Sequence, residues 1–313
     1  GLPFPKHMQN VAEYALGHHE TMDGKGYPRG LTKEQLSVPA RIMALADIFR
    51  LLILAALWGA SFLFMKVGAP EFGPIAFMAL RTSVACAVLL PMLWLKGKPN
   101  TLLTQWRPML TVALFNTAIP FVLFAYATLS LSAGMTSILN ATTPMFGALI
   151  AFLWLKDTLS FQAMLGLIIG FIGVFLLVWS RNVSFTIDGL LPVMAVLLAT
   201  FCYGLSANYT KRYFTGVDSW TMAAGSQTAA TVCLIPLALM YLPNEMPSSN
   251  AWLAGLTLGV ACTGFAYVIF FRLIANVGPT QAVSVTYLIP VFGVMWGMLF
   301  LDEQVTLKML MAG

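Results

Sequence analysis

Residues 161–179 read FQAMLGLIIGFIGVFLLVW, nineteen residues without a charge. A helix rises about 1.5 Å per residue, so this stretch matches the roughly 30 Å hydrocarbon core of a bilayer. Inside that core every backbone polar group needs a partner within the chain, and a helix supplies one for each. Residues 161–179 therefore predict a transmembrane helix.

Stretches of the same kind follow one another after residue 50. Nine of them have the length of about 17–25 residues that a spanning helix needs. They cover approximately residues 51–69, 74–95, 108–129, 133–154, 161–179, 189–210, 219–242, 251–275 and 279–301. A tenth is expected to begin near Thr306, and since about eight residues cannot cross a bilayer, we expect that helix to be truncated at Gly313.

The composition supports a membrane protein. Hydrophobic residues make up 59% of the chain and charged residues 9%, against roughly 25% charged in soluble domains. The basic residues stand singly or in pairs between apolar stretches, which excludes a nucleic-acid-binding surface. The cysteines all lie in apolar stretches and are expected to be small buried hydrophobic residues rather than disulfide or metal partners: Cys86, Cys202, Cys233 and Cys262.

The apolar part is an internal duplication. A shift of 146 residues places Pro144–Gly147 on Pro290–Gly293 and Leu155–Asp157 on Leu301–Glu303. A shift of 145 places Trp58–Ser61 on Tyr203–Ser206 and Lys66 on Lys211. Each repeat would hold five helices, and an odd number makes the two repeats enter the membrane in opposite senses. We expect an all-α, ten-helix, inverted-repeat (5+5) transporter bundle, with repeats at residues 51–180 and 181–313.

Basic residues in the connections predict the orientation. With the N-terminus in the cytoplasm, seven lie at inner connections or helix ends: Lys96, Lys98, Arg107, Lys156, Lys211, Arg212 and Arg272. Three lie at outer ones: Lys66, Arg181 and Lys308. Cytoplasmic loops carry the excess of Lys and Arg, so this orientation is favoured.

Several of these segments resemble a known family. Leu54–Lys66, which reads LAALWGASFLFMK, resembles the first helix of the EamA family of drug/metabolite transporters, and Ala79–Arg81 resembles part of the second. The paired Pro144 and Pro290, with the helix ends that follow them, match the same family. The resemblance covers residues 51–313. It implies helices around a central cavity, alternating access and export of small metabolites such as amino acids or nucleosides.

Residues 1–50 are polar, and they resemble something unrelated. The segment from His18 to Pro28 reads HHETMDGKGYP, and with Arg41–Asp47 it resembles the C-terminal half of an HD-GYP domain. Such domains hydrolyse cyclic di-GMP at a bimetallic centre. The resemblance assigns His18, His19 and Asp47 to metal-ligand positions. The upstream His-Asp pair is missing, so we expect a vestigial, inactive α-helical fragment.

Candidate substrate-binding residues lie within the spans. Arg81 is about seven residues into its helix, so it either reaches outward or faces a wet cavity. Trp58, Tyr203 and Tyr287 lie mid-span, where they either pack or line that cavity. Asn116 and Asn140 either join helices by hydrogen bonds or contact substrate. Pro144 and Pro290 either kink helices in a way that packing absorbs or mark broken helices whose freed carbonyls face the cavity, and their pairing in both repeats favours the second.

The leading hypothesis is a secondary transporter of a small-molecule substrate in a bacterial inner membrane, with no cofactor and with homodimerisation left open. The rivals are a membrane-tethered cyclic-di-GMP phosphodiesterase and a signalling receptor. The acidic side chains between residues 51 and 313 are expected in loops or at helix ends, and all three histidines precede residue 51. Because buried Asp, Glu and His usually carry protons in proton-driven carriers, we expect facilitated efflux or exchange.

Overall fold

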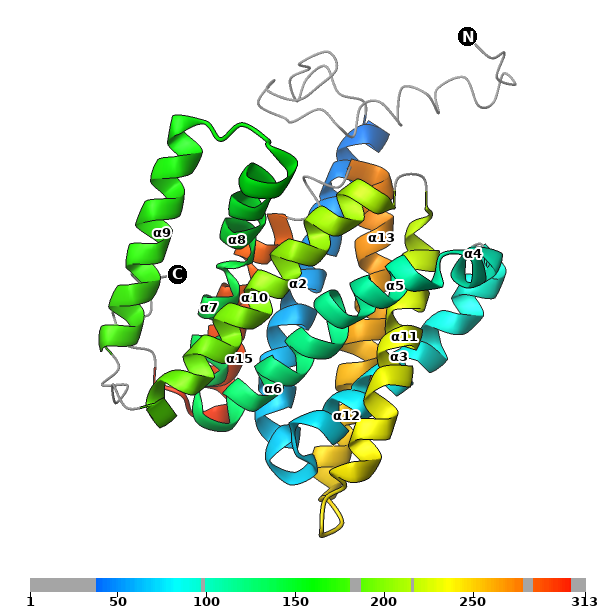
Figure 1. Cartoon of the computed structure of the whole chain (residues 1–313), viewed down its shortest axis with the longest axis vertical. Helices are drawn as coiled ribbons and strands as arrows, with labels where there is room; N and C mark the ends of the chain where they lie inside the picture. The colour runs from blue at the N-terminus through cyan, green and yellow to red at the C-terminus, as the bar shows by residue number, and fades with distance from the viewer. Residues whose placement is uncertain (1–37, 97–98, 181–186, 215–216, 278–283, 305–313) are drawn as a thin grey trace. The chain divides into compact units, whose positions relative to one another are not determined.

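The computed structural model describes residues 38–96, 99–180, 187–214, 217–277 and 284–304 (Figure 1). Every regular element in these ranges is a helix. Eight segments are long and apolar enough to cross a membrane: Leu45–Phe72, Pro74–Leu95, Trp106–Ser130, Ala133–Leu155, Phe161–Trp179, Gly189–Tyr213, Trp220–Met240 and Ser249–Ile274. Val285–Leu301 is a shorter apolar segment. The all-α membrane fold is confirmed, and the expected helix start near Thr306 lies outside the described residues.

The first helix begins before the apolar part does. Helix α2 (Val38–Phe72) continues without interruption through Leu51, where the composition changes. Residues 40–58 contain neither Pro nor Gly, so no residue there ends the helix. The change at Leu51 is therefore a change of side chains and not of backbone conformation.

The chain divides into two compact units. One comprises residues 1–55 and 268–285, and the other comprises residues 56–267 and 286–313. In the first unit, the buried Asp47 carboxylate accepts hydrogen bonds from the Arg50 guanidinium and from Asn276 Nδ2, the latter at 2.9 Å. The candidate site described below lies wholly in the second unit.

The helices of the repeats pack in corresponding ways. The elements concerned are α3 (Pro74–Lys96), α4 (Pro99–Thr104), α5 (Trp106–Ala113), η2 (Leu114–Ala118), α6 (Ile119–Ser130), α10 (Ile187–Tyr213), α11 (Ser219–Met240), α12 (Ser249–Gly259), η4 (Val260–Phe265) and α13 (Ala266–Val277). Helices α3 and α11 pack along each other. Helix α3 also packs on α12 and η4, while α11 packs on α5 and η2.

Two spans contain a π-helical segment at corresponding places. The π-helix η2 begins at Leu114 and η4 begins at Val260, a difference of 146 residues that equals the repeat shift. A π-helix inserts an extra residue into an α-helix and is frequent at functional sites. Both segments lie beside the buried cluster described in the next subsection.

Spans are also interrupted at the paired prolines. Residues Ala141 and Thr142 separate α7 (Ala133–Asn140) from α8 (Thr143–Ile150), which continues into η3 (Ala151–Leu155). Pro144 is the second residue of α8, and Pro290 is the second residue of α15 (Ile289–Leu301), which follows η5 (Ser284–Tyr287). The carbonyls freed before Pro144 have local partners, because the hydroxyls of Thr142 and Thr143 donate to Leu139 O and Asn140 O, each at 2.8 Å.

Helix α9 (Phe161–Ser180), which carries the apolar stretch quoted at the outset, is mostly exposed within the chain. Its exposed side chains are large and apolar, including Ile169, Phe175 and Trp179. Such a surface fits contact with lipid, as expected for a transmembrane helix that is hydrophobic on all sides.

Glycines allow two close helix crossings, and the two crossings correspond. A Cβ at Gly59 would lie 2.8 Å from Gly293 N, and a Cβ at Gly204 would lie 2.7 Å from Gly147 N. The repeat shifts place Gly59 on Gly204 and Gly147 on Gly293. Helix α2 thus meets α15 as α10 meets α8, with small residues at the contact as is usual in membranes.

We predict that Gly204→Ala destabilises the protein, because the new methyl group meets backbone atoms that cannot turn away. Overpacking of this kind costs about 1–3 kcal/mol. Thermal unfolding in detergent measures the effect. Gly166→Ala in α9 is the matched control, since no atom lies within 4 Å of its Cβ position. Equal melting temperatures for the two variants would contradict the close crossing.

Candidate functional site

Arg81 is buried within the second unit. It is the eighth residue of α3, and 6% of its surface is exposed. The Arg81 side chain therefore does not reach outward to the membrane surface in this structure. A charge removed from water costs several kcal/mol unless it is paired, so the groups around Arg81 determine what this site can do.

Two side chains contact the guanidinium directly. Arg81 Nε donates a hydrogen bond to Thr263 Oγ1 at 2.9 Å, and the guanidinium carbon lies 3.6 Å from the centre of the Phe121 ring. Thr263 belongs to η4, where its hydroxyl donates to Leu258 O at 2.9 Å, five residues earlier. The π-helical turn therefore orients the Thr263 oxygen toward Arg81.

The electrostatic neighbours of Arg81 are Tyr203, Cys262 and Tyr267. None of them is a carboxylate, and no acidic side chain in the described ranges forms an ion pair with Arg81. A cation–π contact of a desolvated guanidinium contributes about 2 kcal/mol, and a hydrogen bond to a charged group about 1.5–3 kcal/mol. These contacts offset much of the cost of burial, but they supply no countercharge. The site is electropositive and suits an anion.

Three of the residues singled out in the sequence lie in this cluster with Arg81. Trp58 contacts the Tyr267 ring edge-on, with centroids 6.4 Å apart. Tyr203, its counterpart in the second repeat, packs against Phe124 with centroids 5.7 Å apart. The Asn116 amide, on η2, lies beside the Tyr267 hydroxyl. Trp58, Asn116 and Tyr203 therefore surround the same buried region.

Two other residues lie elsewhere. Asn140 is buried at the end of α7, where the Thr143 hydroxyl donates to its backbone carbonyl. Tyr287 ends η5 and is 66% exposed, so its ring does not join the cluster. Asn140 directly precedes the interruption at Ala141 and Thr142, and Tyr287 ends the 3₁₀-helix that precedes α15.

Sequence reasoning did not single out Phe121, Thr263 or Gln227. Gln227 on α11 is completely buried, and its amide lies beside the Tyr267 hydroxyl without meeting hydrogen-bond geometry. A buried amide in an apolar helix is a signal that could have been found from sequence. The position of Thr263 depends on a π-helix, which the hydrophobic pattern does not reveal.

The metal-ligand positions of the HD-GYP resemblance do not form a described site. His18 and His19 lie outside the described residues. Both hydrogen bonds to Asp47 reach its Oδ1, from Arg50 and Asn276. No group of three His, Cys, Asp or Glu side chains within the described ranges could hold a metal ion.

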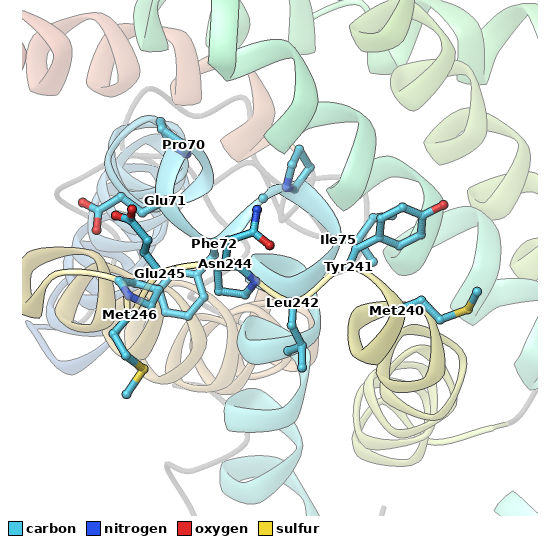
Figure 2. A pocket seen from close by; sticks show the side chains of 14 residues that line it. Pro70, Glu71, Phe72, Ile75, Met240, Tyr241, Leu242, Asn244, Glu245 and Met246 are labelled. Carbon is cyan, nitrogen blue, oxygen red and sulfur yellow. The ribbon is translucent and has the colours of Figure 1, made fainter.

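A separate pocket of about 710 Å³ lies between two helix connections (Figure 2). The turn between α2 and α3 forms one wall and the connection from α11 to α12 forms the other, including Glu71, Tyr241 and Glu245. The Glu71 carboxylate accepts hydrogen bonds from the backbone N–H and the hydroxyl of Ser248. This contact joins the two connections at one end of the second unit.

Comparison with known proteins identifies the larger part of the chain. The sequence profile of the EamA-like transporter family matches residues 46–179 and again residues 190–313. The chain belongs to the EamA-like transporter family. The two matches agree with the internal duplication, and the protein is a membrane transporter whose environment is lipid and whose substrate is a small molecule.

Similar proteins support this assignment. The uncharacterized transporter YoaV of Bacillus subtilis is 22% identical over 258 residues, which are 82% of this chain and 88% of YoaV. A solved structure titled "Crystal structure of protein" superposes with a TM-score of 0.63 at 17% identity, covering 86% of this chain and 92% of the other. That structure supports the fold of this EamA member.

The N-terminal part matches a different family. An HD domain profile covers residues 1–62, which overlap the first EamA match within α2. The 3'3'-cGAMP-specific phosphodiesterase 1 of Vibrio cholerae is 52% identical over 42 residues, which are 13% of this chain and 10% of that enzyme. The resemblance to HD-GYP proteins is therefore confirmed for a short segment.

We predict that Thr263→Val destabilises the protein by about 1.5–3 kcal/mol, because it removes the hydrogen-bond acceptor of a buried charge. Thermal unfolding in detergent measures this loss. Thr117→Val is the matched control at the corresponding position of η2, where the buried hydroxyl has no hydrogen-bond partner. That variant should be neutral or stabilising. A similar loss in both variants would show that Thr263 acts only by packing.

Proposed function

We propose that this EamA protein is a secondary transporter of small organic anions that works by alternating access. The observation that carries the proposal is Arg81, buried in the second unit with no carboxylate partner among the described residues. An anionic substrate would supply the missing countercharge. Trp58, Phe121 and Tyr203 add aromatic surface for the apolar part of such a molecule.

The described spans support transport without a proton relay. Glu71, Asp157, Asp302 and Glu303 lie at or near the ends of their helices, and Asp47 lies near the start of its span. No Asp, Glu or His is near the middle of a described span. Facilitated movement or exchange of substrate therefore fits the chain better than proton coupling. Uphill uptake driven by a pH gradient alone, for a substrate of constant charge, would contradict this.

The anion site predicts the effect of Arg81→Lys. Lysine keeps the charge but lacks the bidentate fork that fits a carboxylate. Uptake of labelled 3-phenylpropionate and 3-phenyllactate into proteoliposomes should fall at least about tenfold, which corresponds to about 1.4 kcal/mol. Arg272→Lys changes an exposed arginine in the same way and should leave uptake unchanged. Uptake of neither anion by the wild type, or equal uptake by both variants, would contradict the anion site.

We place the protein in a bacterial inner membrane with its N-terminus in the cytoplasm. The basic side chains at the proposed inner ends support this, since Arg107, Lys211 and Arg212 lie there. A cysteine at Met246, 89% exposed in the α11–α12 connection, should then react with an impermeant maleimide on intact cells. A cysteine at Trp94, 73% exposed near the opposite end of α3, should be protected. The reverse pattern would invert the topology.

The HD-like segment is proposed to be catalytically silent. The hydrogen bonds that Arg50 and Asn276 donate to Asp47 Oδ1 support this. Manganese-dependent linearisation of cyclic di-GMP that disappears in His18→Ala would contradict it. A phosphodiesterase would remain the second candidate function in that case.

A further inference from the structure

We infer that Gln227 binds a second, uncharged polar group of the substrate, so that the cargo is an organic anion with a hydroxyl, amino or amide group near its charge. This inference rests on the proposed anion site. Gln227 has no exposed surface, and neither its amide oxygen nor its amide nitrogen has a hydrogen-bond partner in the described chain. Leaving a buried polar group unpaired is costly, so a ligand that pairs it gains affinity.

The position of Gln227 ties it to the Arg81 cluster. Its amide lies beside the hydroxyl of Tyr267, which is also an electrostatic neighbour of Arg81. The Asn116 amide lies beside the same hydroxyl. A ligand whose anion pairs with Arg81 would therefore present a neighbouring polar group to amides that can both donate and accept hydrogen bonds.

A matched pair of anions tests this inference. 3-Phenyllactate differs from 3-phenylpropionate by one hydroxyl beside the carboxylate. A site built to bond a hydroxyl rejects the analogue that lacks it, so wild-type proteoliposomes should take up phenyllactate at least about tenfold faster. Gln227→Met should abolish that preference. Its melting temperature should not fall, because the substitution removes an unpaired amide.

Ser226→Ala is the control, since the Ser226 hydroxyl is already bonded to Ala223 O in its own helix and its loss should keep the preference. Equal uptake of the two anions by the wild type, together with loss of both in Arg81→Lys, would overturn the role of Gln227 and leave the anion site standing. An unchanged preference in Gln227→Met would also overturn it. Uptake of neither anion would overturn both proposals.

A second inference is argued from different residues, rests on the proposed alternating access, and concerns the ends of the repeats. We propose that Lys66 with Glu303, and Lys211 with Asp157, are two copies of one lock that hold opposite ends of the transporter closed in turn. The repeat shifts place Lys66 on Lys211 and Asp157 on Glu303. Helices α2 and α10, which carry the lysines, run in opposite directions, so the copies lie at opposite ends (Figure 1).

The backbones at the two carboxylates are alike. Lys156 and Asp302, the residues just before them, both adopt the left-handed conformation with φ of 57° and 52°. In each case the next N–H reaches back six residues: Asp157 N donates to Ala151 O at 3.2 Å, and Glu303 N donates to Gly297 O at 3.1 Å. Non-glycine residues rarely adopt this conformation, so its presence at both places shows that the two repeats share the same unusual turn.

The side chains, in contrast, are in two different arrangements. Lys211 Nζ pairs directly with Asp157 Oδ2 at 2.7 Å. Lys66 and Glu303 do not pair directly and instead hold the α6–α7 connection. Lys66 Nζ donates to Thr128 O at 2.7 Å and Leu131 O at 3.0 Å, while Glu303 accepts from Ala133 N at 2.6 Å and Gly134 N at 3.0 Å.

The arrangement of Lys66 and Glu303 around the α6–α7 connection is the tighter one. A cation at the C-terminal end of α6 and an anion at the N-terminal end of α7 both match the helix dipoles. The direct pair is exposed, with 63% and 46% of the two side chains accessible, and solvent screening leaves such pairs with little effect on stability. Because inverted repeats exchange conformations during alternating access, one structure contains both states of the lock.

Cysteine accessibility tests the lock without measuring transport. Ser137 is buried on α7, and α7 packs against α15. Ser206 is buried on α10, and α10 packs against α8. In a variant without native cysteines, Ser137→Cys reports the Glu303 end and Ser206→Cys reports the Asp157 end. Glu303→Gln should raise maleimide labelling of Ser137→Cys severalfold and lower labelling of Ser206→Cys.

Asp157→Asn should have the reverse effect: it should lower labelling of Ser137→Cys and raise labelling of Ser206→Cys. Glu245→Gln, which removes an exposed carboxylate from the α11–α12 connection, should change neither rate. Reciprocal changes distinguish a lock from local loosening of one helix. Increases confined to the mutated end, or no change in either variant, would overturn the lock whether or not the anion site is correct.

Discussion

A buried guanidinium with too few partners is the constraint on which the rest of this structure depends. Arg81 lies in the lipid-spanning part of the second unit, where an unpaired charge is costly. Thr263 on the π-helix η4 and Phe121 on α6 reduce that cost. The π-helical turn at η4 can be understood as the local distortion that brings a hydroxyl to the charge.

The duplication explains how a chain with so few polar residues obtains precise contacts. Glycine crossings occur twice, between Gly59 and Gly293 and between Gly204 and Gly147, and π-helices begin at corresponding residues. Where the repeats differ, the difference is chemical: Arg81 has no counterpart arginine in α11. A symmetric scaffold thus holds an asymmetric site, and asymmetry is what distinguishes one bound orientation of a ligand from another.

Much of the fold could be predicted from the sequence, because lipid imposes a simple length and polarity rule on every span. Trp58, Asn116 and Tyr203 were chosen because the sequence puts them mid-span, and such positions can be read when spans are regular. The exposure of Tyr287 could not be read in this way, since a 3₁₀-helix precedes α15. The uninterrupted passage of α2 through Leu51 was missed because hydropathy reports side chains and not backbone. Left-handed Lys156 and Asp302 also have no signature in the residue types.

The paired glycine crossings have a consequence for ancestry. Gly59 meets Gly293 as Gly204 meets Gly147, so each crossing joins the first helix of one repeat to the fourth of the other. A single-repeat ancestor would make this contact twice in an antiparallel pair, one copy inserted in each direction. Such an ancestor needs a nearly balanced distribution of Lys and Arg across the membrane. Fusion of the two copies into one chain frees each half to acquire its own charge bias and its own site residues.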